Sequence, residues 1–219
     1  MDDLNRAEPP LHFGDLLPPR DQVLLQLERE AEAGAIPIVG PQEGALLHLL
    51  VVLSRPRLIV ELGTATGYSG IWLLRGSAAA RLITFEVDGG RADRARRAFG
   101  EARLSDRVDV REANAVEGLD GIERESVGLL FNDILFGLRD EARVESCFER
   151  SLATLEEGGL LVADNIGGDE VADADSLSGR CARRWISLVR GERSLTSLAL
   201  PIGGGVLVAW KGSPPPGER

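Results

Sequence analysis

Residues Leu58 to Ser69 read L-I-V-E-L-G-T-A-T-G-Y-S, and this stretch decides the fold. An apolar run ends in Glu61, the glycines Gly63 and Gly67 follow four residues apart, and an apolar helical pattern then begins. This order predicts a buried strand, a tight glycine loop and the N-terminus of a helix. Glycine lets the backbone turn sharply and lets a ligand come close, and the first turn of a helix presents unpaired N–H groups at its positive end. We therefore expect the loop to hold a small ligand.

The spacing of the glycines narrows the kind of ligand. A dinucleotide-binding loop needs G-x-G-x-x-G, with two glycines separated by one residue and a third beyond them. The pattern here is E-x-G-x-x-x-G, from Glu61 to Gly67. The spacing therefore disfavours an NAD-dependent oxidoreductase.

Composition indicates a globular chain that binds neither nucleic acid nor membrane. The chain has 219 residues, 43% of them hydrophobic, which is ample for the core of one domain. Its net charge is −10, from 25 basic and 35 acidic residues, whereas a nucleic-acid footprint needs a basic face. The start of the sequence lacks the apolar core of a signal peptide, and no apolar run is long enough to span a bilayer. A soluble cytoplasmic protein is expected.

The residue types most often used in catalysis are sparse in this chain. Cys147 and Cys181 form no C-x-x-C pair and are expected to be reduced core thiols. His12 is interpreted as a surface residue, and His48, inside an apolar helical pattern, as a core histidine with its polar atoms satisfied. The only lysine is Lys211. No catalytic residue is assigned.

Strand and helix patterns alternate from residue 58 onward, which predicts a parallel sheet with helices on both faces. The expected strands are Leu58–Leu62, Leu82–Val87, Val108–Glu112, Val127–Asn132 and Gly159–Ala163. The expected helices are Tyr68–Leu74, Gly90–Ala102, Asn114–Leu119, Arg139–Leu155 and Glu170–Val189. The last two strands, Ser194–Leu200 and Gly205–Trp210, are separated by so short a segment that they must form an antiparallel hairpin.

The segments before and after this pattern set the domain organisation. Residues 1–20 are rich in proline and read as an N-terminal arm. Asp21 can cap a helix that runs to about Ala33, and Pro41 can begin a second, buried helix through Leu53. We expect one domain over 21–211, made of N-terminal helices (21–54) and a Rossmann-like core (58–211), with a disordered tail at 212–219.

Polar residues at the ends of the strands are candidates for ligand binding, because ligands of open α/β sheets lie beyond the carboxyl ends of the strands. Glu86 lies about 20 residues beyond the glycines, where a carboxylate can accept both hydroxyls of a ribose. Asp88 is interpreted as a solvated loop acid. Asn114 follows the third strand and either caps the next helix or helps hold a base; the two roles are compatible.

The fourth and fifth strands end in side chains that carry oxygen. Asp133 follows one of them, and Asp164 with Asn165 follows the other. Such ligands suit a hard ion, Mg²⁺ or Ca²⁺, and Mg²⁺ keeps positions open for substrate oxygens. A simpler alternative is that Asp164 and Asn165 only initiate a turn. Together with Asp133 and the glycine loop, they indicate a divalent-metal site.

From about Pro37 to Lys211 the chain resembles the catechol and caffeoyl-CoA O-methyltransferase family. The order and spacing of five pieces carry the resemblance: P-I-V-G-P-Q-E-G, E-L-G-T-A-T-G-Y-S, L-I-T-F-E-V-D, F-N-D and G-G-L-L-V-A-D-N. It implies an α/β, Rossmann-like class I methyltransferase fold, with a mostly parallel seven-stranded sheet of order 3-2-1-4-5-7-6. It also implies S-adenosylmethionine and a divalent cation such as Mg²⁺ as cofactors, a small-molecule acceptor, and a homodimer.

The same resemblance implies roles for individual residues. Those at the methionine end of the cofactor would be Val39, Glu61, Gly63, Gly67, Tyr68 and Ser69. Glu86 would hold the ribose, and Asn114 and Ala115 would flank the adenine. The metal ligands would be Asp133, which also borders the cofactor, Asp164 and Asn165.

One position departs from the family pattern. The family usually has F-x-D-x-x-K, and its lysine assists deprotonation of the substrate hydroxyl. Here the segment reads F-N-D-I-L-F and places Phe136 at the position of the lysine. The segment after Asn165, I-G-G-D-E-V-A-D-A-D, is strongly acidic where the substrate lid would be.

Three functions are consistent with these residues. The first is a metal-dependent O-methyltransferase that acts on a small acceptor with vicinal oxygens, catechol-like or a natural product. The second is a methyltransferase for a non-catechol hydroxyl or an amine, suggested by Phe136 and the acidic segment, although a solvated loop also explains those charges. The third is a protein that keeps the cofactor pocket and has lost catalysis.

Overall fold

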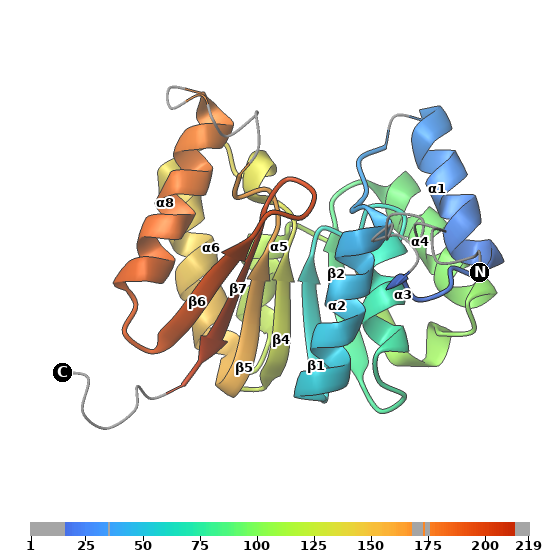
Figure 1. Cartoon of the computed structure of the whole chain (residues 1–219), viewed down its shortest axis with the longest axis horizontal. Coiled ribbons are helices and arrows are strands. Elements are labelled where there is room, and N and C mark those ends of the chain that lie inside the picture. The colour runs from blue at the N-terminus through green and yellow to red at the C-terminus, as the bar shows by residue number, and fades with distance from the viewer. Residues whose placement is uncertain (1–15, 35, 168–172, 174–175, 213–219) are drawn as a thin grey trace, which may run out of the picture.

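This computed structural model describes residues 16–34, 36–167, 173 and 176–212. Within them, the apolar runs form strands that pair into a seven-stranded sheet. Its order, β3-β2-β1-β4-β5-β7-β6, confirms the predicted topology (Figure 1). The strands are β1 (Leu58–Leu62), β2 (Arg81–Glu86), β3 (Val108–Glu112), β4 (Val127–Asn132), β5 (Leu155–Ala163), β6 (Leu195–Leu200) and β7 (Val206–Lys211).

Strand direction also agrees with the sequence pattern. Neighbouring strands from β3 to β5 are parallel, and β7 is antiparallel to both β5 and β6. The parallel strands therefore all direct their carboxyl ends to one edge of the sheet, the edge where ligands bind in such folds.

Helices cover both faces of the sheet, α2 in front of it and α6 behind it in Figure 1. In β4, Leu130 packs in the cluster that contains α5, α6 and α8, whereas Leu129 and Phe131 pack on the other face with α1 to α4. This alternation follows from the two-residue period of a strand. The helices are α1 (Gln22–Gly34), α2 (Pro41–Ser54), α3 (Tyr68–Arg75), α4 (Gly89–Glu101), α5 (Ala115–Gly118), α6 (Glu141–Thr154) and α8 (Leu177–Gly191), with short 3₁₀ turns η2 (Ser105–Arg107), η3 (Leu119–Gly121) and η4 (Leu135–Gly137).

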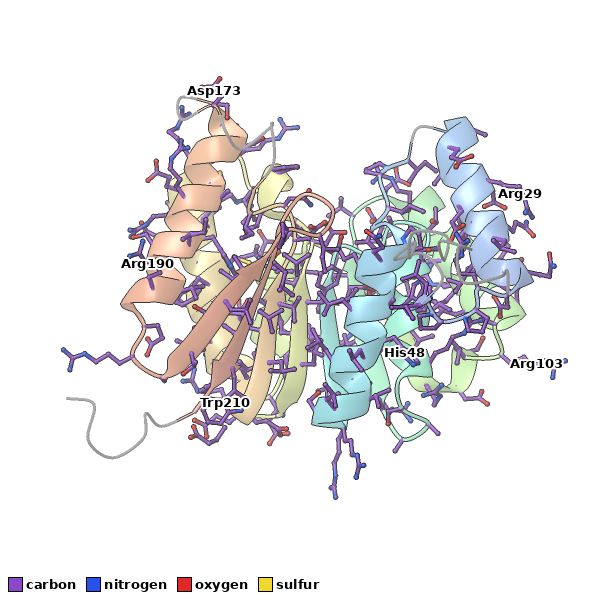
Figure 2. The ribbon with its side chains drawn as sticks, in the orientation of Figure 1. Arg29, His48, Arg103, Asp173, Arg190 and Trp210 are labelled. Carbon is purple, nitrogen blue, oxygen red and sulfur yellow. The ribbon has the colours of Figure 1, made fainter. Side chains whose placement is uncertain are left out.

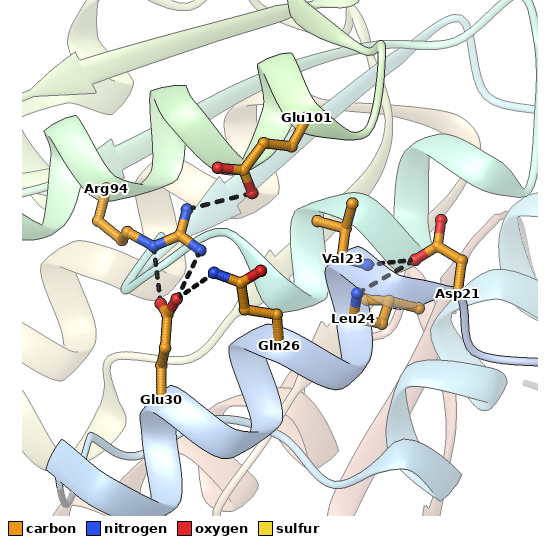
Figure 3. Close-up of polar contacts among 7 residues, drawn as sticks. All are labelled: Asp21, Val23, Leu24, Gln26, Glu30, Arg94 and Glu101. Carbon is orange, nitrogen blue, oxygen red and sulfur yellow. Dashed lines mark hydrogen bonds and ion pairs between the residues drawn. The ribbon is translucent and has the colours of Figure 1, made fainter.

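Charged contacts attach α1 to α4 (Figure 3). The Asp21 carboxylate accepts hydrogen bonds from the first backbone N–H groups of α1, so it caps the helix as its sequence position predicts. Farther along α1, Glu30 accepts two hydrogen bonds from the Arg94 guanidinium of α4, at 2.7 and 3.1 Å. Arg94 also pairs with Glu101 at 3.7 Å. Asp21 therefore caps the start of α1, and Glu30 attaches the same helix to α4.

Two boundaries differ from the sequence-based expectation by more than two residues, the starts of β5 and α8. β5 begins at Leu155, which was assigned to the preceding helix, because Leu155 pairs with Val127 of β4 and is fully buried. The helix expected from Glu170 is described only from Leu177, where the Ser176 hydroxyl caps it by accepting from the Gly179 N–H. Residues 168–172, 174 and 175, like 1–15 of the expected arm and 213–219 of the expected tail, lie outside the described residues.

His48 lies on the side of α2 that faces α3 (Figure 2). Its ring contacts Trp72 edge-on, with centroids 6.2 Å apart. The expectation of a satisfied histidine was wrong: Nδ1 is buried and has no hydrogen-bond partner among the described residues. Cys147 and Cys181 are free and buried, as predicted. In the part of the chain that the structure describes, no helix combines the length and apolarity needed to cross a membrane.

Candidate active site

A cavity of about 640 Å³ opens at the carboxyl ends of the parallel strands. Its walls come from the segment before α2 and from the residues that follow β1 to β5. The predicted site residues that line it are Val39, Gly63, Glu86, Asn114, Ala115, Asp133, Asp164 and Asn165. The predicted residues Glu61, Gly67, Tyr68 and Ser69 are not among its lining residues.

The glycine loop follows β1, between the strand ends that carry Glu86 and Asp133, and its Gly63 lines the cavity. Gly63 and Gly67 have φ angles of 99° and 91°, in the left-handed region that side chains disfavour. A Cβ at Gly63 would lie 3.1 Å from the Asp133 carbonyl oxygen, so a side chain there would also crowd the neighbouring strand end. The backbone N–H groups of Gly63 and Thr64 donate to the Phe85 carbonyl and hold the loop against β2.

Glu61 lies beneath the loop rather than in the cavity. Its side chain is fully buried and accepts hydrogen bonds from the Ser69 and Thr84 hydroxyls, both at 2.6 Å. Burial raises the pKa of Glu61 to about 7, although these two hydrogen bonds oppose the increase. The carboxyl therefore joins the start of α3 to β2 and supports the loop from below.

Tyr68 and Ser69, at the start of α3, also direct their side chains into the protein. The Tyr68 ring is buried against Trp72, and its hydroxyl donates to Glu28 of α1 at 2.6 Å. Ser69 is bonded to Glu61. The backbone N–H groups in the first turn of α3 have no partners within the helix.

The ends of β2 and β3 form the side of the cavity away from Asp133 and Asp164. Each Glu86 carboxylate oxygen accepts one backbone hydrogen bond, from Ala65 N at 2.9 Å and from Asp88 N at 3.0 Å, which fixes its orientation. Asp88 caps α4 by accepting from Arg91 N. Asn114 caps α5, which confirms the first of its two predicted roles, and it also lines the cavity; a contact with a base stays a prediction. Val87 also lines the cavity and is 70% exposed, which leaves an apolar surface beside Glu86.

Asp133, Asp164 and Asn165 meet beyond the ends of β4 and β5, next to the glycine loop, and are called the acidic edge. The Asn165 amide Nδ2 donates to Asp133 Oδ1 at 3.2 Å and to Asp164 Oδ2 at 2.9 Å. Backbone hydrogen bonds continue the sheet past its last paired residues, from Asp133 N to Leu62 O and from Asp164 N to Asn132 O. The two carboxylates are therefore held on rigid strand ends and share one amide NH₂ group between them.

Three acidic side chains lie close together at this edge, and their pKa values are raised. Burial and the charge of Asp164 raise the pKa of Asp133 well above its usual range, and burial also raises the pKa of Asp164. Glu43 of α2, to which the sequence assigned no role, is only 1% exposed and hydrogen-bonded to Asp164. Burial, followed by the charges of Asp164 and Asp133, raises the pKa of Glu43 to about 9.

The donor chemistry of the acidic edge fits a hard divalent cation. All its candidate ligands are oxygens, and Asn165 Nδ2 occupies the position between two carboxylates that a cation would share. Gly204 in the β6–β7 turn leaves room there, since a Cβ would lie 2.6 Å from Asn165 Oδ1. No three His, Cys, Asp or Glu side chains of the described residues are arranged so that they could hold a metal ion. The candidate set is therefore two carboxylates and one amide.

Phe136 lines the cavity at the position where the resembling family carries its lysine. Lys211 does not replace that lysine. Its ammonium group donates to the Leu152 and Leu155 carbonyls, at the end of the sheet opposite the cavity. The cavity therefore has an aromatic ring and no lysine among its lining residues in the described part of the chain.

Comparison with known proteins gives one consistent family. A family model described as O-methyltransferase matches residues 20–211. A catechol O-methyltransferase of Niastella koreensis is 33% identical over 199 residues, which cover 88% of this chain and 89% of that protein. A catechol O-methyltransferase of Mycobacterium tuberculosis is 28% identical over 185 residues, 82% of each chain.

Solved structures agree with these sequence relatives. An O-methyltransferase from Bacillus cereus in complex with SAH has a TM-score of 0.77 at 29% identity and covers 90% of this chain and 94% of that one. An O-methyltransferase from Streptomyces achromogenes, involved in tomaymycin synthesis and solved with SAM, has a TM-score of 0.79 at 26% identity, with coverage of 92% and 94%.

Proposed function

The chain belongs to the O-methyltransferase family, and we propose that it transfers the methyl group of S-adenosylmethionine to a hydroxyl of a small acceptor held at the acidic edge. One observation carries this proposal. A single cavity is lined both by Gly63 of the glycine loop and Glu86 and by Asp133, Asp164 and Asn165. Methyl transfer is an in-line displacement, so the main task of the protein is to align donor and acceptor.

The cofactor end of the cavity suits S-adenosylmethionine. Glu86 keeps lone pairs free for two ribose hydroxyls after accepting its backbone hydrogen bonds. Val87 and Ala115 offer apolar surface for a base, beside the cap residue Asn114. The N–H groups at the start of α3 suit the methionine carboxylate. The Bacillus cereus and Streptomyces achromogenes relatives were solved with SAH and SAM, which supports the same cofactor here.

Asp133, Asp164 and Asn165 would hold a divalent cation such as Mg²⁺. A bound cation would lower the pKa of an acceptor hydroxyl, so that a lysine is not required for its deprotonation. Half a turn of the Asn165 amide would exchange Nδ2 for Oδ1 and direct an oxygen to the ion. Phe136 and Ile134 give the acceptor an apolar wall, which favours an aromatic ring such as a catechol or a phenolic natural product.

Chelation tests the metal part of this proposal. EDTA should reduce methyl transfer to a catechol acceptor by about a hundredfold or more, and Mg²⁺ should restore it. Asp164→Asn should lose turnover while binding S-adenosylhomocysteine with unchanged affinity in calorimetry, because Asp164 follows β5, which β4 separates from the glycine loop after β1. Turnover that is indifferent to EDTA would refute the cation. Tight cofactor binding without turnover on any acceptor would instead support a protein that has lost catalysis.

We also propose that two copies of the chain associate. Large apolar side chains are exposed on α2 and on the hairpin: Leu49 (51%), Leu53 (70%), Leu198 (56%) and Trp210 (43%). Leu198 pairs with Val208, and Trp210 with Leu160, and both partners pack on the α2 side of the sheet. These four residues therefore lie on one face of the molecule and are called the apolar face. Figure 2 shows Trp210 at the lower end of β7.

A further inference from the structure

Glu43 is an acidic residue that is almost completely buried. It lies in the first turn of α2, where an acidic side chain is common because it complements the helix dipole. Such a residue is normally solvated, yet Glu43 is 1% exposed. An apolar side chain would fill the space at lower cost, since burying an acid is unfavourable unless it is well bonded.

The contacts of Glu43 connect it to the acidic edge. Its carboxyl is hydrogen-bonded to that of Asp164 and lies near Asp133. Its Oε2 faces the β6–β7 turn, where a Cβ at Gly203 would lie 2.9 Å away. Its Oε1 is buried and has no hydrogen-bond partner among the side chains that the structure describes. One oxygen of this buried carboxyl is therefore left without a partner in the described part of the protein.

α2 is rigid at this point. A Cβ at the adjacent Gly44 would lie 2.5 Å from the Trp72 ring, so the helix touches α3 through its backbone. Gly40 and Pro41 start the helix with an extended residue followed by a proline, which fixes the entry of the chain. The carboxyl of Glu43 is therefore presented to Asp164 from a fixed support.

We propose that Glu43 is a positioning residue of the cation site, which holds the Asp164 carboxylate in the orientation that a divalent cation requires. The inference rests on the proposed function, since it assumes a cation at the acidic edge. Residues that hydrogen-bond to metal ligands orient them, and their loss commonly weakens metal affinity by about 10- to 100-fold. Glu43 acts through Asp164 and is not among the residues that line the cavity, so its loss should leave cofactor affinity unchanged.

Binding of Mn²⁺ alone to the full chain, measured by calorimetry in the presence of saturating S-adenosylhomocysteine, tests this role. Glu43→Met should weaken Mn²⁺ binding by about tenfold or more, whereas Glu43→Gln, whose amide can still donate to Asp164, should stay within about threefold of wild type. Glu43→Asp keeps the carboxyl but shortens the side chain by one methylene, so it should weaken Mn²⁺ binding as Glu43→Met does. If Glu43→Met does not fold, Glu43→Asp still tests the role of Glu43. The matched control is Glu149→Gln on α6, an exposed acid, which should bind Mn²⁺ as the wild type does.

The outcomes separate the inference from the proposed function. Wild-type protein that binds S-adenosylhomocysteine but not Mn²⁺ would refute the cation site and the role of Glu43 with it. Wild-type protein and both Glu43→Met and Glu43→Asp binding Mn²⁺ equally well would refute the role of Glu43 alone. A loss in Glu43→Gln as large as in Glu43→Met would show that the charge of Glu43, rather than its hydrogen bond, supports the ion, and would overturn the positioning role.

Discussion

At the scale of the residue, Glu61 illustrates how the glycine loop is supported. Its carboxyl is enclosed between the Ser69 and Thr84 hydroxyls and has no exposure to solvent. The Thr84 hydroxyl also contacts that of Thr64 at 2.6 Å, so a chain of polar groups runs under the loop. Such a network is stable only when each member is satisfied.

The raised pKa of Glu61 predicts that stability depends on pH. Because this pKa is about 7 and the ordinary value is 4.5, the folded protein keeps a proton that the unfolded chain releases between these values. The contribution of Glu61 to the free energy of unfolding is therefore complete below the ordinary pKa and declines as pH rises through about 7. Above that pH the loss is complete and amounts to up to about 3 kcal/mol. The free energy of unfolding, measured with urea, should fall between pH 5 and pH 8 in the wild type. In Glu61→Gln this fall should be smaller, by an amount of the order of 3 kcal/mol. Parallel pH dependence in the two proteins would contradict this assignment.

At the scale of the element, the β6–β7 turn closes the acidic edge. Backbone hydrogen bonds from Ile166 N to Gly205 O and from Gly167 N to Gly204 O fasten the turn to the segment after Asn165. Gly203 and Gly204 face Glu43 and Asn165 at distances that exclude a methyl group. The turn thus limits the volume available at the edge.

Gly204→Ala should displace the Asn165 amide and weaken Mn²⁺ binding by about tenfold, because the new Cβ would lie 2.6 Å from Asn165 Oδ1. The φ angle of Gly204 is not positive, so the substitution adds bulk without backbone strain. Gly121→Ala is the control, since nothing lies within 4 Å of a Cβ there. Equal Mn²⁺ affinity in Gly204→Ala and wild type would show that the turn does not constrain the site.

The order of elements was predictable because apolar runs and glycines mark it directly in the sequence. Side-chain directions were not. Tyr68 begins α3 beside the loop, but Tyr68 and Trp72 are four residues apart on one face of the helix and pack together, which turns the Tyr68 hydroxyl to Glu28. Leu155 was assigned to a helix since only its pairing with Val127 distinguishes it as strand.

At the scale of the whole molecule, residues distant in sequence build the candidate site, and this explains what sequence reasoning missed. Glu43 lies in P-Q-E-G, one of the five pieces that resemble the family, but its own segment is a helix that is apolar on nearly every side. Its contact with Asp164 depends on how α2 crosses the sheet. Asp133, Asp164 and Asn165 could be grouped in advance because parallel strands end at a common edge.

The apolar face predicts the oligomeric state. Light scattering after gel filtration should give twice the chain mass of 23.5 kDa. Leu53→Glu combined with Leu198→Glu should shift the protein to the monomer, because two buried charges would face each other across a symmetric contact. Leu177→Glu, on α8 at the opposite face, should leave the mass unchanged. A monomeric wild type at micromolar concentration would exclude this role for the apolar face.

The contact of Glu43 with Gly203 has a consequence for biosynthesis. The strand, loop and helix that form the cofactor end are close together in the chain, whereas the acidic edge needs α2 and the last hairpin at the same time. During translation, the contacts between residues near position 43 and those near position 203 can form only after the hairpin has been synthesised. Contacts this distant in sequence form late and slow the final step of folding. A nascent or truncated chain that lacks the hairpin would therefore have the glycine loop formed while the acidic edge is still open.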